Sequence, residues 1–489
     1  MLGFPLWLIV THFLNIIFMT LLVRSGLQIL ADHPKLYWND DCTPGTEWIK
    51  FGKKEIPNDK LWTSHDEVEY INPVLGITGG THKLGSARRW HFFSVILWLS
   101  NGFVYVTMLF VTGEWRRLVP TSFDIFPKAF YTFTQYLTFH FPNPAEFTPY
   151  DPLQQLTYFA VIFIFAPLMI VTGLALAPAI TARFPWYQKL FGGRQAARSI
   201  HFLGLVGISL FVVIHLVMVA LVNGPKNISN ITLGDSNGDL SLAITIFAIG
   251  IAIFVFSQFF VTWYTLRYEK RVQDILDPVI NFFTNSLLDR IPSKQHYSKK
   301  DISSYFRVNG LPPENEEWKL FAEHNFRDWK LKIGGLVKNK AEFSLEDLKN
   351  NFTKNEQITK HNCIQGWSAV AEWAGVSMQD ILEYVEPLPN AQYIVFTAYD
   401  EDEKGRPYYE TFTLKEMMMP QSLLAYEMNY ETLPSVYGAP LRLRAESKLG
   451  FKMVKYLRSI DIVENLSGVG EGRRGYKEGV ELFDEVAAI

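Results

Sequence analysis

The first half of the chain consists of long apolar runs separated by polar segments. Five runs reach the ~20 residues that a helix needs to cross a bilayer, and they are residues 6–29, 92–112, 156–180, 200–222 and 241–264. The last four contain no Asp, Glu, Lys or Arg, and the first carries Arg24 near its end, where it can snorkel to the membrane surface. One such run is also typical of a buried core helix, but five in succession favour an all-α transmembrane bundle. The opening MLGFPLWLIV lacks a basic region and a cleavage site, so we expect the first span to be retained.

The pattern changes after Tyr264, where charged residues become frequent and the long apolar runs stop. Short alternating segments predict strands; they lie at 329–337, 392–400, 408–414 and 440–447. Short helices are predicted after the candidate N-caps Ser344 and Ser377. We therefore expect a membrane domain (1–223), a loop with a fifth span (224–264), a charged connector (265–315) and a soluble mixed α+β domain (316–489).

Composition agrees with two unlike halves. Hydrophobic residues make up 48% and charged residues 19%, and the mean hydropathy of +0.05 lies between values typical of soluble and of membrane proteins. The formal net charge of −3 gives no reason to expect nucleic acid as a partner. The two cysteines, Cys42 and Cys363, exclude a disulfide scaffold, a CxxC redox pair and a cysteine-ligated iron–sulfur cluster.

Four of the 11 histidines lie in or at the edge of apolar spans: His12, His91, His201 and His215. A histidine at membrane depth is costly and suggests function, although one that hydrogen-bonds across a helix interface is the plain alternative. His201 and His215 are 14 residues apart, which places both on one helix face and about 21 Å apart along the axis.

The alternation of helix direction then predicts two pairs, His91 with His201 and His12 with His215, one near each membrane surface. Two stacked bis-histidine sites suit two b-type haems. Zinc would need further ligands close by, and no cysteine or carboxylate lies there.

Residues 6–223 resemble the diheme cytochrome b subunit of thiosulfate reductases, formate dehydrogenases and nickel–iron hydrogenases. The resemblance rests on HFFSVILWLSNGFVYV (91–106), FPWYQKLFGGRQAARSIHFLG (184–204) and the spacing of His201 and His215. It implies a cytochrome that exchanges electrons between membrane quinone or quinol and a catalytic partner, with the fifth span outside its four-helix core.

Cys363 lies in HNCIQGWSAVAEWAGV (361–376). A lone cysteine is usually a small buried hydrophobe, and a cysteine–histidine hydrolase is a second alternative because His361 is close by. The polar neighbours His361 and Asn362 are a setting in which a thiolate can be held.

Residues 316–465 resemble the sulfite-oxidase-like molybdopterin domain, a group that includes the bacterial catalytic subunit that reduces methionine sulfoxide in proteins. The carrying segments are the cysteine segment, SLLAYEMN (422–429) and YGAPLRLRAESKLGFKMVKYLRSI (437–460). The resemblance implies that Cys363 is the protein ligand to molybdenum and the catalytic residue. It also implies pterin or phosphate contacts at Arg442, Met453, Val454 and Lys455, with Lys452, His361 and Asn325 as further candidates. Tyr437 replaces an asparagine of the methionine-sulfoxide-reducing branch, and the acidic tract 400–407 falls where substrate-side loops would be.

Together the two resemblances predict a membrane-bound molybdenum oxidoreductase that links the quinone pool to a small oxo-substrate, such as a sulfoxide or sulfur oxyanion, with Mo-molybdopterin and two haem b as cofactors. A transporter or sensor with a soluble regulatory domain is the alternative. We expect a bacterial inner membrane location. Lys and Arg are more frequent in the loops after the first and third spans, which predicts a cytoplasmic catalytic domain, whereas the cytochrome resemblance predicts the opposite side.

Overall fold

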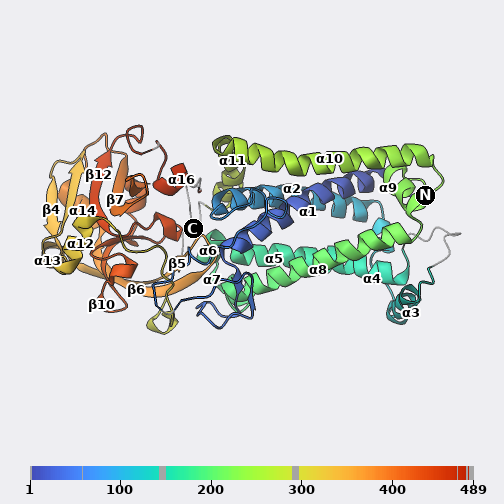
Figure 1. Cartoon of the computed structure of the whole chain (residues 1–489), viewed down its shortest axis with the longest axis horizontal. Coiled ribbons are helices and arrows are strands. Elements are labelled where there is room, and N and C mark those ends of the chain that lie inside the picture. Colours follow the sequence, from blue (N-terminus) through green and yellow to red (C-terminus); the bar gives the residue numbers. More distant parts are fainter. Residues whose placement is uncertain are drawn as a thin grey trace.

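The computed structural model describes residues 3–57, 59–141, 150–288, 297–470, 472–480 and 483, with the side chains of 283–288 left aside. Within this part of the chain five helices are long and apolar enough to cross a membrane, which confirms the predicted bundle. They are α1 (Leu6–Asp32), α2 (Leu84–Val111), the continuous α4–η2–α5 (Pro152–Leu176), α8 (Arg194–Leu221) and α10 (Leu240–Arg267). Figure 1 shows them side by side, with the soluble domain at one end of the bundle and the N-terminus at the other.

Short elements connect these spans. They are β1 (Lys35–Leu36), β2 (Ile49–Lys50), η1 (Glu114–Arg117), α3 (Ile125–Leu137), α6 (Pro178–Arg183), α7 (Pro185–Lys189) and α9 (Gly224–Leu233). The third span contains a π-helical stretch, η2 (Val161–Phe165), between α4 (Pro152–Ala160) and α5 (Ala166–Leu176).

Two helices begin well before their apolar runs, so His91 and His201 lie about two turns inside them rather than at their first residues. The added turns carry basic and polar side chains that bond to neighbouring loops instead of lipid.

Arg24 also departs from expectation, because it is only 8% exposed and does not snorkel. Its guanidinium donates to Gln258 O at 3.0 Å and to Gly76 O at 2.7 Å, and so joins α1 to α10 and to the α1–α2 loop.

The segment predicted as a charged connector contains a long helix, α11 (Glu269–Leu288). Its buried Val272 and Leu276 recur at helical spacing and pack with Trp90 of α2. Arg89 of α2 donates to Asp277 Oδ1 of α11 at 2.5 Å. The helix therefore rests on the bundle at the end nearest the soluble domain (Figure 1).

The soluble domain holds two five-stranded sheets. One has the order β10–β9–β6–β5 with β11 also paired to β9, and the other the order β4–β3–β12–β7–β8, in which β3 and β12 run parallel. The strands are β3 (Lys330–Gly335), β4 (Ala341–Ser344), β5 (Lys354–Asn362), β6 (Ser368–Ser377), β7 (Tyr393–Glu401), β8 (Pro407–Thr413), β9 (Ser422–Met428), β10 (Glu431–Thr432), β11 (Arg442–Ala445) and β12 (Leu457–Val463).

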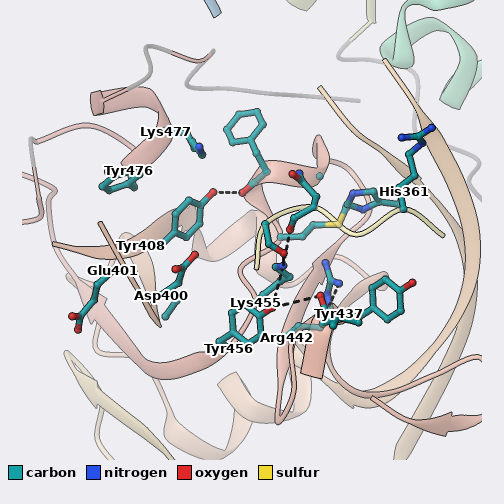
Figure 2. A pocket seen from close by; sticks show the side chains of 18 of the residues that line it. His361, Asp400, Glu401, Tyr408, Tyr437, Arg442, Lys455, Tyr456, Tyr476 and Lys477 are labelled. Carbon is teal, nitrogen blue, oxygen red and sulfur yellow. Dashed lines mark hydrogen bonds between the residues drawn. The ribbon is translucent and has the colours of Figure 1, made fainter. Parts of the chain in front are cut away.

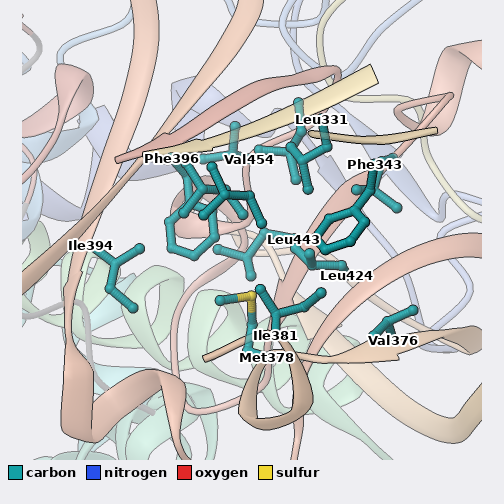
Figure 3. Packing of buried hydrophobic residues seen from close by; sticks show 14 of the residues in the cluster. Leu331, Phe343, Val376, Met378, Ile381, Ile394, Phe396, Leu424, Leu443 and Val454 are labelled. Atoms are coloured by element: carbon teal, nitrogen blue, oxygen red, sulfur yellow. The ribbon is translucent and has the colours of Figure 1, made fainter. Parts of the chain in front are cut away.

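Helices cover and connect the two sheets. They are η3 (Lys299–Asp301), α12 (Glu316–Glu323), α13 (Leu345–Asn351), α14 (Met378–Val385), α15 (Leu414–Met417), η4 (Ser435–Tyr437), η5 (Gly450–Lys452) and α16 (Tyr476–Val480). Ser344 and Ser377 cap α13 and α14 as predicted. The apolar core includes Leu331, Phe396 and Leu443, each 0% exposed (Figure 3). This core holds rigid the loops that carry the candidate site.

Candidate active site

Cys363 lies in the tight loop between β5 and β6. Its N–H donates to Trp367 O at 3.0 Å, and the N–H of Gly366 donates to Cys363 O at 3.2 Å. Gly366 has a φ of 108°, which side chains rarely adopt, so this turn depends on glycine. The cysteine is 2% exposed, and its sulfur is 3.9 Å from Nδ2 of Asn309. Burial raises the pKa of the thiol to about 11, although the backbone N–H of Gln365 opposes this shift.

A cavity of about 290 Å³ lies against the residues that surround this loop (Figure 2). His361 and Trp367, which flank Cys363, line it, together with Asn309. Four of the residues predicted from the sequence meet in its wall: His361, Arg442, Met453 and Lys455.

One wall of the cavity is cationic. Arg442 lies 4.7 Å over the Trp373 ring and donates to Tyr437 O at 2.7 Å. Its buried Nε has no hydrogen-bond partner among the described residues. Burial and the nearby Arg444 lower the pKa of Arg442 to about 9. Burial and Arg442 lower the pKa of Lys455 to about 7, against the opposing effect of Asp400. Such crowded cations favour an anionic ligand.

His361 is held in one tautomer. Arg444 Nη1 lies 3.1 Å from His361 Nδ1, and because a guanidinium can only donate, Nδ1 must accept and the proton sits on Nε2. Burial, then Arg444 and Arg442, lower the pKa of His361 well below its usual value, so the ring is neutral. A Cβ on Gly450 would lie 2.3 Å from this ring, so the absence of a side chain at Gly450 makes room for it.

The opposite wall is acidic and aromatic. Figure 2 shows Asp400, Glu401, Tyr408, Tyr476 and Lys477 on the side of the cavity away from His361 and Arg442. Burial raises the pKa of the Asp400 carboxyl, and the Lys455 and Lys477 ammonium groups oppose that rise. The acidic tract noted in the sequence therefore does reach the cavity.

Three other predicted residues lie elsewhere. Val454 packs in the apolar core. Lys452 is 1% exposed and bonds to Glu410 and Glu478, each at 2.5 Å, rather than lining the cavity. Asn325 is exposed in the turn after α12, where its φ is 54°.

Sequence reasoning missed Arg307 and Asn309, which line the cavity from the predicted connector. The Asn309–Gly310 pair is a turn signal that could have drawn attention to this segment. Nothing local to Arg307 indicated that it would reach the cavity.

In the membrane region the structure brings the histidines together as the helix directions predicted. The ring centres of His12 and His215 are 6.4 Å apart, and a metal bound by both rings at roughly 2 Å per nitrogen would put the ring centres ~6 Å apart. His91 of α2 lies near His201 of α8. No group of three or more His, Cys, Asp or Glu side chains converges as a metal site in the described ranges.

The tautomers of His91 and His201 follow from their neighbours. Ser25 Oγ donates to Leu21 O at 2.7 Å, so it must accept from Nδ1–H of His91, 3.0 Å away. Thr172 Oγ1 donates to Leu168 O at 2.6 Å and likewise must accept from Nδ1–H of His201 at 2.9 Å. Both rings therefore keep a free lone pair on Nε2, the state in which imidazole binds a metal.

The environment of the second pair is less polar. Nδ1 of His215 lies 3.2 Å from the Tyr158 hydroxyl, while Nδ1 of His12 is buried without a hydrogen-bond partner among the described residues.

The first turns of α8 contact the cysteine loop directly. Arg194 Nη1 donates to Trp367 O at 3.2 Å, and Gln195 Nε2 donates to Gly366 O at 2.9 Å. His201 follows Gln195 by six residues, or about 9 Å along the helix. Helix α8 therefore carries His201, from the histidine pair nearer the soluble domain, and also holds the loop of Cys363.

Comparison with known proteins assigns both regions. A family model for prokaryotic cytochrome b561 matches residues 3–234, and a model for the oxidoreductase molybdopterin binding domain matches residues 319–468. These are the regions in which the sequence showed its two resemblances.

Curated relatives match parts of the chain. A putative protein-methionine-sulfoxide reductase subunit YedZ1 of Azospira oryzae is 31% identical over 37% of this chain and 64% of its own length. Protein-methionine-sulfoxide reductase catalytic subunits MsrP of Xanthomonas axonopodis pv. citri and Xanthomonas campestris pv. campestris are 33% and 32% identical, each over 28% of this chain and 46% of the relative. The chain thus spans about half to two thirds of the relatives it matches.

Proposed function

Because this chain joins a prokaryotic cytochrome b561 region to an oxidoreductase molybdopterin binding domain, we propose that it is a quinol-dependent molybdenum reductase of the bacterial cytoplasmic membrane. Its substrate would be a small oxo-compound such as a sulfoxide or a sulfur oxyanion. It would use Mo-molybdopterin and two b haems, and the fusion would make the docking of the two parts intramolecular.

The soluble site suits a molybdenum–pterin group by its chemistry. Cys363 offers one buried sulfur, and thiolate is the form of cysteine that binds metal. Arg442 and Lys455 offer positive charge for the pterin phosphate, since guanidinium and ammonium groups form strong bonds with phosphate. When bound, the molybdenum would supply the exchange of an oxygen atom with the substrate.

The membrane site suits haem by the state of its histidines. We assign His91 and His201 to the haem nearer the soluble domain and His12 and His215 to the farther one. The hydroxyls of Ser25 and Thr172 fix the Nδ1–H tautomer of the nearer pair and aim each ring. In such ligands the second nitrogen is normally held this way.

The proposed net reaction is balanced. A quinol is oxidised to a quinone and releases two electrons and two protons. A sulfoxide takes up both, its sulfur–oxygen bond breaks, and the products are the sulfide and water. His361 lines the cavity and carries its proton on Nε2, and we propose that it donates a hydrogen bond to an oxygen atom of the substrate there.

The contact of α8 with the cysteine loop is the observation that carries the proposal. Gln195 holds Gly366, and His201 lies on the same helix about 9 Å away. This arrangement keeps Cys363 at a fixed distance from the pair His91 and His201. Electron transfer between a haem and a molybdenum centre requires such a fixed distance.

We place the soluble domain on the cytoplasmic side, following the basic loops. Several of those basic residues also serve the fold, since Lys35 pairs with Glu67 at 2.9 Å and Arg89 with Asp277 at 2.5 Å. Trypsin treatment of right-side-out and inverted vesicles tests the assignment. Cleavage in the exposed turn around Lys404 should occur only in inverted vesicles, and cleavage only in right-side-out vesicles would contradict it.

The function is tested with the purified, cofactor-loaded chain. After reduction by a soluble quinol, the haem α band should fade when a sulfoxide is added, because electrons leave for the substrate. Cys363→Ser should keep its haems reduced, whereas the control Glu386→Ala, which breaks an exposed ion pair with Lys338, should respond like wild type. If the wild-type haems stay reduced with every sulfoxide, N-oxide and sulfur oxyanion tried, the proposal is wrong.

A further inference from the structure

Two segments from outside the soluble domain's sheets cover Cys363. One is the part of the α1–α2 loop at 33–42 and 63–67, and the other is residues 303–310 of the connector; together we call them the cap. Tyr37, Cys42 and Phe306 of the cap belong to the same buried apolar cluster as Cys363 and Trp367. The sulfur therefore lies beneath chain that the membrane region contributes.

Hydrogen bonds fasten the cap to the cysteine loop. The N–H of Ser64 donates to Val308 O at 3.0 Å, which joins the two cap segments. Gln365, two residues after the cysteine, donates through Nε2 to Ser64 O at 3.2 Å. On the far side, the Tyr437 hydroxyl donates to Phe306 O at 2.7 Å.

A cluster of buried ion pairs holds the two cap segments together. Glu67 Oε1 accepts from Lys35 Nζ at 2.9 Å and from Arg307 Nη1 at 2.7 Å, and all three side chains are at most 4% exposed. Arg307 also donates to the Tyr37 hydroxyl at 2.8 Å and to Cys42 O at 2.9 Å. Opening the cap would leave these buried charges unpaired, which is strongly unfavourable.

We propose that this cap selects substrates by size, so that the site accepts small free oxo-compounds and excludes a methionine sulfoxide side chain held in a folded protein. The inference rests on the proposed function. A protein-borne side chain needs an open surface around the reacting centre, and here the cysteine is 2% exposed under two ordered segments. The cavity of about 290 Å³ beside the cap is bounded on one side by the acidic and aromatic residues Asp400, Tyr408 and Tyr476.

The substrate test separates the two claims. The holoenzyme should reduce dimethyl sulfoxide or free methionine sulfoxide with quinol and leave a folded, oxidised protein unreduced. Equal turnover of the oxidised protein would overturn the cap inference while the proposed function stands. Turnover of no oxo-compound would overturn the proposed function itself.

Thiol labelling tests the cap without turnover. In cofactor-free Cys42→Ser protein, Cys363 is the single thiol, and iodoacetamide can be compared with a bulky polyethylene glycol maleimide. The bulky reagent should label the native chain far more slowly than the urea-unfolded chain. Equal rates in the two states would overturn the proposal.

Variants locate the effect. Glu67→Ala should raise the bulky reagent's rate by roughly tenfold or more, because local opening becomes easier. The control Glu386→Ala, which breaks an exposed pair with Lys338, should not change it. If Glu67→Ala does not fold, Tyr437→Phe removes only the hydroxyl bond to Phe306 and should raise the rate in the same direction. An unchanged rate in the folded variants would also overturn the proposal.

Discussion

Lys452 and Lys455 lie three residues apart, and the structure gives them opposite roles. Lys452 is sealed between Glu410 and Glu478, both 0% exposed. In Lys452→Met two buried carboxylates would face each other without a cation. Breaking a buried ion pair by removing one partner costs about 3–5 kcal/mol, which corresponds to a fall in melting temperature of roughly 10 °C in a domain of this size.

Lys455→Met should behave differently. The Lys455 ammonium donates to Asn309 O at 2.7 Å, and burial followed by the charge of the nearby Arg442 lowers its pKa. Asp400, the carboxyl that Lys455 acts on, is only partly buried and forms no ion pair with it in the described part of the chain, so we expect a stability change of about 1 kcal/mol or less. Because it removes a cation from the cavity wall, molybdenum–pterin content should fall.

Two assays on the full chain in detergent decide between the roles. Tryptophan fluorescence during heating reports stability, and metal analysis of protein prepared well below the melting temperature reports cofactor content. Lys452→Met should melt early yet retain molybdenum when prepared cold, whereas Lys455→Met should melt normally and lack it. If Lys452→Met instead lost molybdenum at unchanged stability, Lys452 would be a cofactor contact and the reasoning from its ion pairs would be refuted.

Three further predictions concern the haems and the response to acid. His215→Ala should remove one haem and leave the other, measured as haem per chain, and loss of neither would contradict the pairing. Thr172→Val removes the acceptor for Nδ1–H of His201 and should weaken haem retention by roughly 10–100-fold; unchanged retention on dilution would contradict the tautomer argument. Burial tends to raise the pKa of Glu416, but the charges of Lys448 and Arg474 and the hydrogen bonds to the carboxylate together outweigh burial and lower it to about 2. Because the Glu416 pKa is lower in the folded than in the unfolded chain, the ionised carboxylate stabilises the fold at pH values above the unfolded pKa of ~4.5. Up to about 3 kcal/mol of this stability should be lost as the pH falls from ~4.5 towards 2. Glu416→Gln should make the free energy of unfolding depend less on pH over this range.

The membrane half could be predicted well because its determinants are local. Apolar runs of helical length identify spans, and the direction of each helix then determines which histidines share a depth. The ends of α2 and α8 could not be predicted, because their polar first turns are stabilised by loops and by the soluble domain. Arg24 was misjudged for a similar reason, since its partners Gln258 and Gly76 are distant in sequence.

The soluble half was harder to predict where tertiary packing overrides pattern. Strand β6 reads SAVAEWAGVS without alternation, because nearly all its residues are buried. Its partner β5 and the strand β9 were missed as well. The resemblance drew attention to the cysteine segment, yet it did not separate Lys452, which binds two glutamates, from Lys455, which lines the cavity. The cap could not be predicted, because no local pattern links Glu67 to Arg307 across 240 residues.

The central claim is that one polypeptide holds two b haems in the membrane and a molybdenum centre at Cys363. The most direct measurement is the molybdenum and haem content of the purified wild-type chain, made with both cofactors available. We predict two b haems and one molybdenum per chain, with molybdenum absent from Cys363→Ser at unchanged haem content. A colourless wild-type chain without molybdenum would contradict the account.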